Sequence, residues 1–182
     1  KFILSPPLRA KEHQEAIWQG IKDGTLQVIA TDHCSFDFHG DKQNGKDDFT
    51  KCPNGAPGVE TRMPIVFSEG VSKGRLSLNE FAAVTSTNPA KIFGMYPKKG
   101  VLAPGSDADI VLMNPDMEVT ITKNILHENV DYTPYEGIQV KGWPVMTMVR
   151  GQAVVENERL QVPLGFGRYI NRKPVKYTEL LK

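Results

Sequence analysis

The chain has 182 residues, of which 40% are hydrophobic, enough to bury the core of one ordinary domain or of parts of two. Its 22 Lys and Arg residues nearly cancel 21 Asp and Glu residues, and a net charge of +1 argues against a nucleic-acid or membrane-surface partner. The longest apolar runs have about six residues, far short of the roughly 20 that span a bilayer. Two cysteines are too few for a disulfide framework, so we expect a reducing, cytoplasmic location.

Strand and helix signals alternate in the first part of the chain. Residues 2–4 form a short apolar run that stops before two prolines, and residues 10–23 show helical periodicity that ends before Gly24. Residues 26–31 are β-branched and apolar, like a buried strand of a parallel sheet. The order of strand, helix and strand predicts an α/β fold.

A polar segment rich in Gly and Pro follows, over residues 37–58. Long irregular loops in compact domains are commonly functional or disordered. Helical spacing then recurs over residues 59–70, and Ser77 with Glu80 forms a capping-box pattern. A short helix is predicted from Pro89 to Gly94.

The remainder of the chain, after about residue 98, has the pattern of an all-β region. A hairpin is predicted at residues 150–152, and the stretch from residue 165 reads as an extended tail that needs a surface to lie on. The predicted strands are residues 108–112, 119–122, 138–140, 145–149 and 153–155.

The tip of the predicted strand at residues 26–31 carries the first candidate for chemistry, Asp32. Catalytic carboxylates lie at strand ends on the active-site face of a (β/α)₈ barrel, where they bind a metal or act as a general base. A capped turn is an equally good explanation of an Asp at this position. The residue pattern leaves both open.

The neighbouring residues offer weaker candidates. His33 points away from Asp32 if strand geometry persists, so we expect it to make a supporting or structural hydrogen bond. Cys34 and Cys52 lack the partners of a catalytic thiol and are predicted to be small buried side chains. The other three histidines, at positions 13, 39 and 127, are expected at the surface.

Two further positions lie where backbone groups could meet a ligand. Asn54 lies in the segment "PNGAPG", in which two prolines restrict the backbone and two glycines give it conformational freedom. Ser5 follows the earlier predicted strand, at the same predicted edge of the sheet as Asp32. From the residue pattern alone, a rigid loop without a ligand is the slightly better explanation.

Five motifs together resemble the dihydropyrimidinase and D-hydantoinase family of the amidohydrolase superfamily. They are "SPPLR", "TDHCSF", "GKDDFTKCPNGAPGVETR", "TSTNPAKIFGMYPKKGVLAPGSDADIVL" and "GFGRYINRKP", in that order along the chain. The resemblance implies an α/β fold: the last part of a metal-dependent (β/α)₈ barrel, followed by part of a β-sandwich. The barrel portion would cover residues 1–97 and the sandwich portion residues 98–164. The tail, residues 165–182, would contact neighbouring subunits of a homotetramer.

The resemblance also implies roles for single residues. Asp32 would bind one of two divalent metal ions, expected to be zinc, and would handle the proton of the attacking water. Ser5 and Asn54 would bind a small cyclic amide or imide through their backbone groups. The family's other ligands, histidines and a carboxylated lysine, have no counterpart in this chain. We therefore expect a fragment that binds zinc poorly, is unstable alone and hydrolyses nothing by itself.

Two rival functions remain. A non-catalytic dihydropyrimidinase-like scaffold protein would have lost metal ligands, whereas this chain keeps Asp32 and Asn54. An allantoinase or dihydroorotase would be another cyclic amidase, although the stretch "FTKCPNGAPGVE" looks more like the hydantoinase branch.

Overall fold

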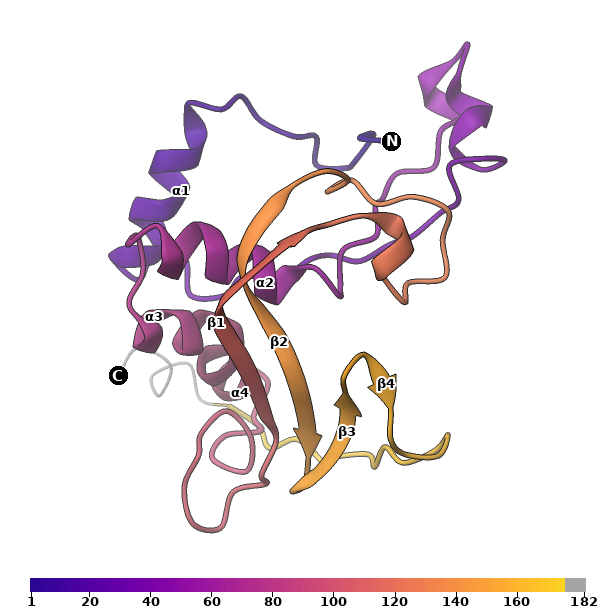
Figure 1. Ribbon diagram of the computed structural model, residues 1–182. Helices are drawn as coiled ribbons and strands as arrows, with labels where there is room; N and C mark the ends of the chain where they lie inside the picture. Colours follow the sequence, from indigo (N-terminus) through magenta and orange to yellow (C-terminus); the bar gives the residue numbers. More distant parts are fainter. Residues whose placement is uncertain (176–182) are drawn as a thin grey trace.

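The computed structural model describes residues 1–175 and shows two unlike regions (Figure 1). Residues 1–61 are mostly irregular, with helix α1 (His13–Lys22) and two short 3₁₀ helices, η1 (Lys42–Gly45) and η2 (Phe49–Lys51). Residues 62–160 contain the remaining helices and the sheet. None of the helices within the described residues is long and apolar enough to cross a membrane.

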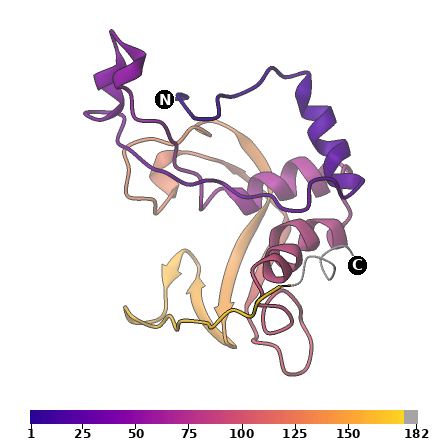
Figure 2. The ribbon, with the colours of Figure 1, turned by 180° about the vertical axis from the view of Figure 1, so that it is seen from behind.

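Helix α1 confirms the predicted helix, and Gly24 follows it with a φ of 80° that favours glycine. The predicted strands at residues 2–4 and 26–31 are wrong for the described chain. A strand needs a ladder of hydrogen bonds to a neighbouring strand, and no such neighbour occurs within residues 1–175. From behind, the segment after α1 is seen to run along the helices (Figure 2), where Ile29 N donates to Val84 O at 3.1 Å.

Two helical stretches follow. The first joins α2 (Arg62–Val66) to a π-helical turn, η3 (Phe67–Ser72). The second joins α3 (Leu78–Ala82), a π-helical turn η4 (Ala83–Thr87) and α4 (Asn88–Ile92). The capping box of Ser77 and Glu80 is confirmed. The predicted short helix at Pro89 is confirmed as α4, with Pro89 in its first turn, and it continues directly from the π turn η4.

The sheet has four antiparallel strands in the order β1-β2-β3-β4. They are β1 (Ile110–Thr120), β2 (Gln139–Val149), β3 (Gln152–Glu156) and β4 (Arg159–Leu160). The predicted hairpin is confirmed: Arg150 and Gly151 have φ of 53° and 79°, as a tight two-residue turn requires. Because this is the one sheet within residues 1–175, the predicted β-sandwich is not confirmed.

The sheet packs against the helical stretch of α2 and η3. Ser68 Oγ accepts a hydrogen bond from Lys141 N at 3.0 Å, and Ser72 Oγ donates to Lys141 O at 3.1 Å. A Cβ at Gly142 would lie 2.1 Å from the Phe67 ring, so only glycine permits this close approach. Helix and sheet therefore form a single packed unit.

The described part of the tail, up to residue 175, is irregular and lies on the body of the protein. Lys173 N donates to Gly94 O at 3.0 Å, and Arg150 Nη2 donates to Phe166 O at 2.8 Å. The predicted extended tail on a surface is confirmed this far. Residues 176–182, which belong to the same predicted tail, lie outside the described residues.

Candidate functional site

The segments that carry Ser5, Asp32 and Asn54 meet in one place. Gly55 N donates to Ile3 O at 3.3 Å, which joins the segment of Asn54 to that of Ser5. Cys34 N donates to Ala56 O at 3.3 Å, which joins the same segment to that of Asp32. All three candidate side chains are exposed. The residues from 53 to 56 thus run between the other two candidate segments.

Gly55 makes this close packing possible. Its φ is 148°, and a Cβ there would lie 2.3 Å from Cys34 O. No residue with a side chain fits without moving the backbone beside Asp32. The glycine of the "PNGAPG" stretch is therefore a structural requirement of the site.

Asp32 adopts a left-handed conformation, with φ of 47°, which Asp tolerates better than most residues. No hydrogen bond to its carboxylate occurs within residues 1–175, so the bond that a turn cap would need is absent there. The carboxylate is exposed and free to bind a ligand.

His33 makes the structural hydrogen bonds that its position predicts. Its Nδ1 accepts from Gly58 N at 3.1 Å and from Val59 N at 3.2 Å, so this nitrogen is unprotonated here. Glu128 Oε1 lies 3.9 Å from the same atom and accepts from Glu60 N at 3.0 Å. His33 thus fixes the start of the helical stretch relative to Asp32.

Lys42 is a buried cation that the sequence analysis missed. Its side chain is almost fully buried, at 4% exposure, and its Nζ donates to Ile3 O at 3.0 Å and to Pro53 O at 2.7 Å. No ion pair to Lys42 occurs within the described residues. Nothing in the sequence distinguishes it from the exposed lysines of the same loop, because the acceptors are backbone carbonyls far away along the chain.

The connector between β1 and β2 holds the loop of residues 37–58 from outside. The Asp131 carboxylate accepts from Phe38 N at 2.6 Å and from His39 N at 2.8 Å, and His39 Nδ1 lies 2.6 Å away. Burial would raise the pKa of Asp131, but these hydrogen bonds outweigh it and lower the pKa below 3.8. His39 is exposed, as predicted, although it is paired.

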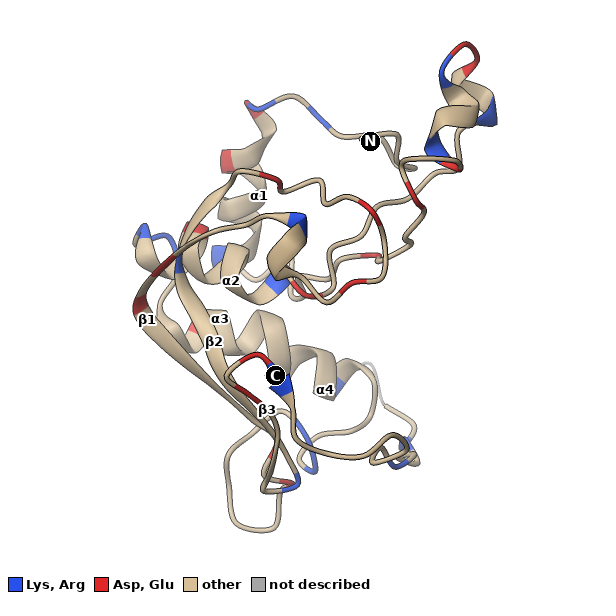
Figure 3. Ribbon diagram, turned by 45° about the vertical axis from the view of Figure 1, so that its right-hand side comes forward, with Lys and Arg blue, Asp and Glu red and all other residues tan. Residues whose placement is uncertain are grey.

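His127, in the same connector, makes a second set of contacts, with Glu60 and Glu158. Its Nδ1 lies 2.8 Å from Glu60 Oε1, its backbone N donates to Glu60 Oε2 at 2.7 Å, and its Nε2 lies 3.1 Å from Glu158 O. The hydrogen bond and charge of Glu60 raise the pKa of His127 above 6.5. The predicted surface positions of His127 and His13 are both confirmed. Acidic and basic residues are interspersed over this part of the molecule (Figure 3).

The two cysteines differ. Cys52 is buried, as predicted, and lies beside the backbone of Gly45. Cys34 is exposed, so its predicted burial is wrong. The reason is the same as for the missing strands: within residues 1–175 no neighbouring strand covers the segment after Asp32.

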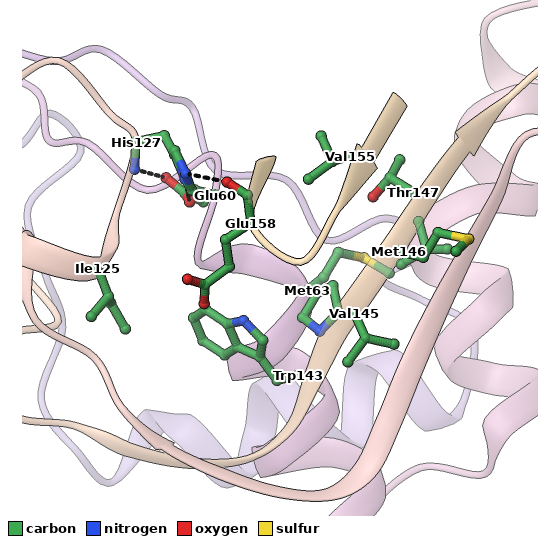
Figure 4. A pocket seen from close by; sticks show the side chains of 12 residues that line it. Glu60, Met63, Ile125, His127, Trp143, Val145, Met146, Thr147, Val155 and Glu158 are labelled. Atoms are coloured by element: carbon green, nitrogen blue, oxygen red, sulfur yellow. Dashed lines mark hydrogen bonds and ion pairs between the residues drawn. The ribbon is translucent and has the colours of Figure 1, made fainter. Parts of the chain in front are cut away.

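A cavity lies elsewhere, between the sheet and α2 (Figure 4). It has a volume of about 400 Å³, and its walls include Met63, Trp143 and Met146, with the pair of Glu60 and His127 at one side. None of Ser5, Asp32 and Asn54 lines it. The cavity therefore lacks the groups that the predicted chemistry needs.

Metal binding by the described residues alone would be incomplete. No cluster of three or more His, Cys, Asp or Glu side chains suited to a metal ion occurs within residues 1–175. A catalytic zinc needs about three protein ligands. Asp32, with its exposed and unbonded carboxylate, fits one ligand position.

Comparison with known proteins identifies the relatives of this chain. The chain is 48% identical to D-hydantoinase of Geobacillus stearothermophilus over 181 residues, which is 100% of this chain and 38% of that protein. It is 48% identical over 174 residues to a D-phenylhydantoinase of Escherichia coli, again 38% of the relative's length. The crystal structure of dihydropyrimidinase from Brevibacillus agri matches with a TM-score of 0.94 and 50% identity, covering 97% of this chain and 38% of that one.

These likenesses support a fragment of a (β/α)₈ barrel for the first part of the chain. The chain spans about 38% of the length of the relatives it matches. Residues 3–154 match the amidohydrolase family. The chain therefore belongs to the amidohydrolase family, within which it resembles the hydantoinases and dihydropyrimidinases.

Proposed function

We propose that the chain is part of a zinc-dependent cyclic amidohydrolase that opens the ring amide of dihydropyrimidines or 5-substituted hydantoins. The observation that supports this proposal is the meeting of three segments: residues 53–56 bond to the segment of Ser5 through Ile3 O and to the segment of Asp32 through Cys34 N. The carboxylate of Asp32 is exposed and has no hydrogen-bond partner within residues 1–175. The names of the relatives, hydantoinases and a dihydropyrimidinase, support the choice of substrate.

Ser5 and Asn54 would orient the substrate through their main chains. Within residues 1–175 neither the N–H nor the C=O group of these residues has a hydrogen-bond partner. A planar cyclic amide or imide presents alternating N–H and C=O groups, which such backbone donors and acceptors can match. Fixing the ring this way would hold its amide carbon in reach of the attacking water.

Asp32 would handle the proton. Its carboxylate would accept a proton from the attacking water as the new C–O bond forms, and would donate it to the ring nitrogen as the C–N bond breaks. The product would be a ring-opened carbamoyl amino acid. Bound divalent metal ions would lower the pKa of the water and polarise the amide carbonyl.

The remaining parts of the site would come from outside this chain. We propose two zinc ions, with histidines and a carboxylated lysine as their other ligands, in a cytoplasmic homotetramer whose subunits meet through residues 165–182. Residues 1–97 would form barrel and residues 98–164 sandwich portions. The isolated chain would then bind zinc weakly and show no turnover.

A chimera tests the proposal. This chain would replace the matching segment of Geobacillus stearothermophilus D-hydantoinase, which shares 48% identity with it. The chimera would be assayed on dihydrouracil, hydantoin, allantoin and dihydroorotate, with zinc content measured in parallel. We expect hydrolysis of dihydrouracil or hydantoin to be fastest.

Two results would contradict the proposal. Equal or faster turnover of dihydroorotate or allantoin would assign the chain to another cyclic amidase. A folded, zinc-loaded chimera that hydrolyses none of the four compounds would favour the non-catalytic scaffold.

A further inference from the structure

We propose that Lys42 is a positioning residue that sets the spacing between the backbones of Ser5 and Asn54, and thereby the affinity for the cyclic substrate. This inference rests on the proposed function. Lys42 is not itself expected to touch substrate, because its ammonium group already bonds two carbonyl oxygens inside the protein.

The first step of the argument is the pair of hydrogen bonds that Lys42 makes. Ile3 O, at 3.0 Å, belongs to a residue two positions before Ser5, and Pro53 O, at 2.7 Å, to the residue before Asn54. One ammonium group thus joins the two candidate substrate-binding segments. Hydrogen bonds from a charged donor are roughly twice as strong as neutral ones.

The second step concerns how rigid this link is. Ile3 O also accepts from Gly55 N at 3.3 Å, so the two segments are held by a direct backbone bond and by the lysine together. The side chain of Lys42 is buried, and its ammonium group lies 5.8 Å from the centre of the Phe36 ring, where a cation is favoured. Both ends of the lysine are fixed, because its backbone N donates to Asp37 O at 3.0 Å.

The third step is the cost of burying this charge. A buried cation is expensive unless strong partners replace its water, and here backbone carbonyls are the partners. An apolar side chain of the same length would avoid that cost and fill the same space, but it could not bond the two carbonyl oxygens. A lysine in this place therefore points to a required geometry of the two carbonyl-bearing segments.

Paired variants of the chimera test the inference. Lys42→Met removes the donors and keeps the length, and Lys46→Met is the control, since Lys46 is an exposed lysine of the same loop. For Lys42→Met we expect KM to rise about 10-fold while kcat stays within about 3-fold, because substrate orientation is weakened and proton transfer at Asp32 is not. Lys42→Arg, which keeps charge and donors, should bring KM back to within about 3-fold of the unmodified chimera.

Two structural readouts separate this role from metal loss or general instability. Zinc content should be the same in all variants, and the Gly55 amide, which bonds Ile3 O, should exchange its hydrogen faster in Lys42→Met only. If Lys42→Met does not fold, Lys42→Gln takes its place, with the same rise in KM expected.

The inference fails if KM is unchanged in Lys42→Met, or if kcat falls with KM constant. It also fails if both neutral variants are insoluble, since Lys42 would then serve stability alone. Failure of the proposed function would give a different experimental result. The unmodified chimera would then hydrolyse no cyclic amide, while exchange at Gly55 would still report whether Lys42 holds the two segments.

Discussion

In residues 62–160 large apolar side chains such as Val66, Phe81 and Trp143 are buried, whereas in residues 1–61 the side chains of Phe2, Leu26 and Val59 are exposed. The first of these regions is held by its own apolar clusters. In the second, Trp18, Ile21 and Ile29 join an apolar cluster with Leu76 and Val84. The loop of residues 37–58 is held by polar contacts, many of them made by the connector between β1 and β2. Functional loops are commonly positioned in this way by a rigid scaffold that other parts of the chain form.

The difference shows how the candidate site is kept in shape. Ser5, Asp32 and Asn54 all belong to the polar region, where backbone hydrogen bonds and the ammonium group of Lys42 fix their positions. Directional bonds define a geometry more narrowly than apolar contact does. Because the two regions depend on different kinds of contact, they should respond differently to mutation.

The largest effect on stability is expected from the apolar region. Trp143→Ala would leave a cavity in the cluster of Ile121, Leu126 and Val140 and lower the free energy of unfolding by about 3–5 kcal/mol. Urea unfolding of the chimera, followed by circular dichroism, measures this. Phe49→Ala, at an exposed aromatic of residues 1–61, is the control and should change little. Equal effects of the two variants would refute the contrast between the regions.

A smaller and local effect is expected from the polar contacts. Asp131→Ala removes the acceptor of Phe38 N and His39 N, and should lower local stability by about 1–3 kcal/mol. Hydrogen exchange should quicken at those two amides and stay unchanged in β1 and β2. Asp116→Ala, at an exposed carboxylate, serves as the control. Faster exchange throughout the sheet would mean that the stability of residues 62–160 depends on the polar contacts of residues 1–61.

The smallest effect is a pH dependence from His127. Because its pKa is raised above 6.5 in the folded protein, the stability from its pairing with Glu60 is complete below pH 6.5 and is lost as pH rises through the folded pKa. The side chain is 63% exposed, so solvent screening reduces the gain to about 0.3–0.5 kcal/mol. Relative to His127→Gln, the parent should lose this advantage as pH is raised from below 6.5 through the folded pKa of His127. A constant difference over that range would contradict the assignment.

Local signals in the sequence predicted much of the fold. The helix before Gly24, the capping box at Ser77 and the turn at Arg150 and Gly151 all depend on residues within a few positions of one another. The predicted strands at residues 2–4 and 26–31 failed because a strand depends on a distant partner. For the same reason the burial of Cys34 was predicted wrongly.

The candidate site, too, was predicted only in part. Asp32, Ser5 and Asn54 came from motifs that resemble a known family, and their catalytic and binding roles stay predictions. Lys42 could not be found, since its acceptors lie 39 and 11 residues away along the chain. His33 was predicted to make a structural bond, but its partners, Gly58 and Val59, emerged only from the fold.

Asp32→Ala in the chimera tests the central claim most directly, with turnover, zinc content and urea unfolding measured on the same preparation. Because Asp32 is exposed and has no hydrogen-bond partner for its carboxylate within the described residues, its loss removes no stabilising contact there. The unfolding midpoint should fall only slightly, since alanine tolerates the left-handed backbone at this position less well than aspartate does. Turnover of dihydrouracil or hydantoin should fall by about 10³-fold or more, since the proton acceptor and one metal ligand are lost together. Near-normal turnover with intact zinc content would contradict the account.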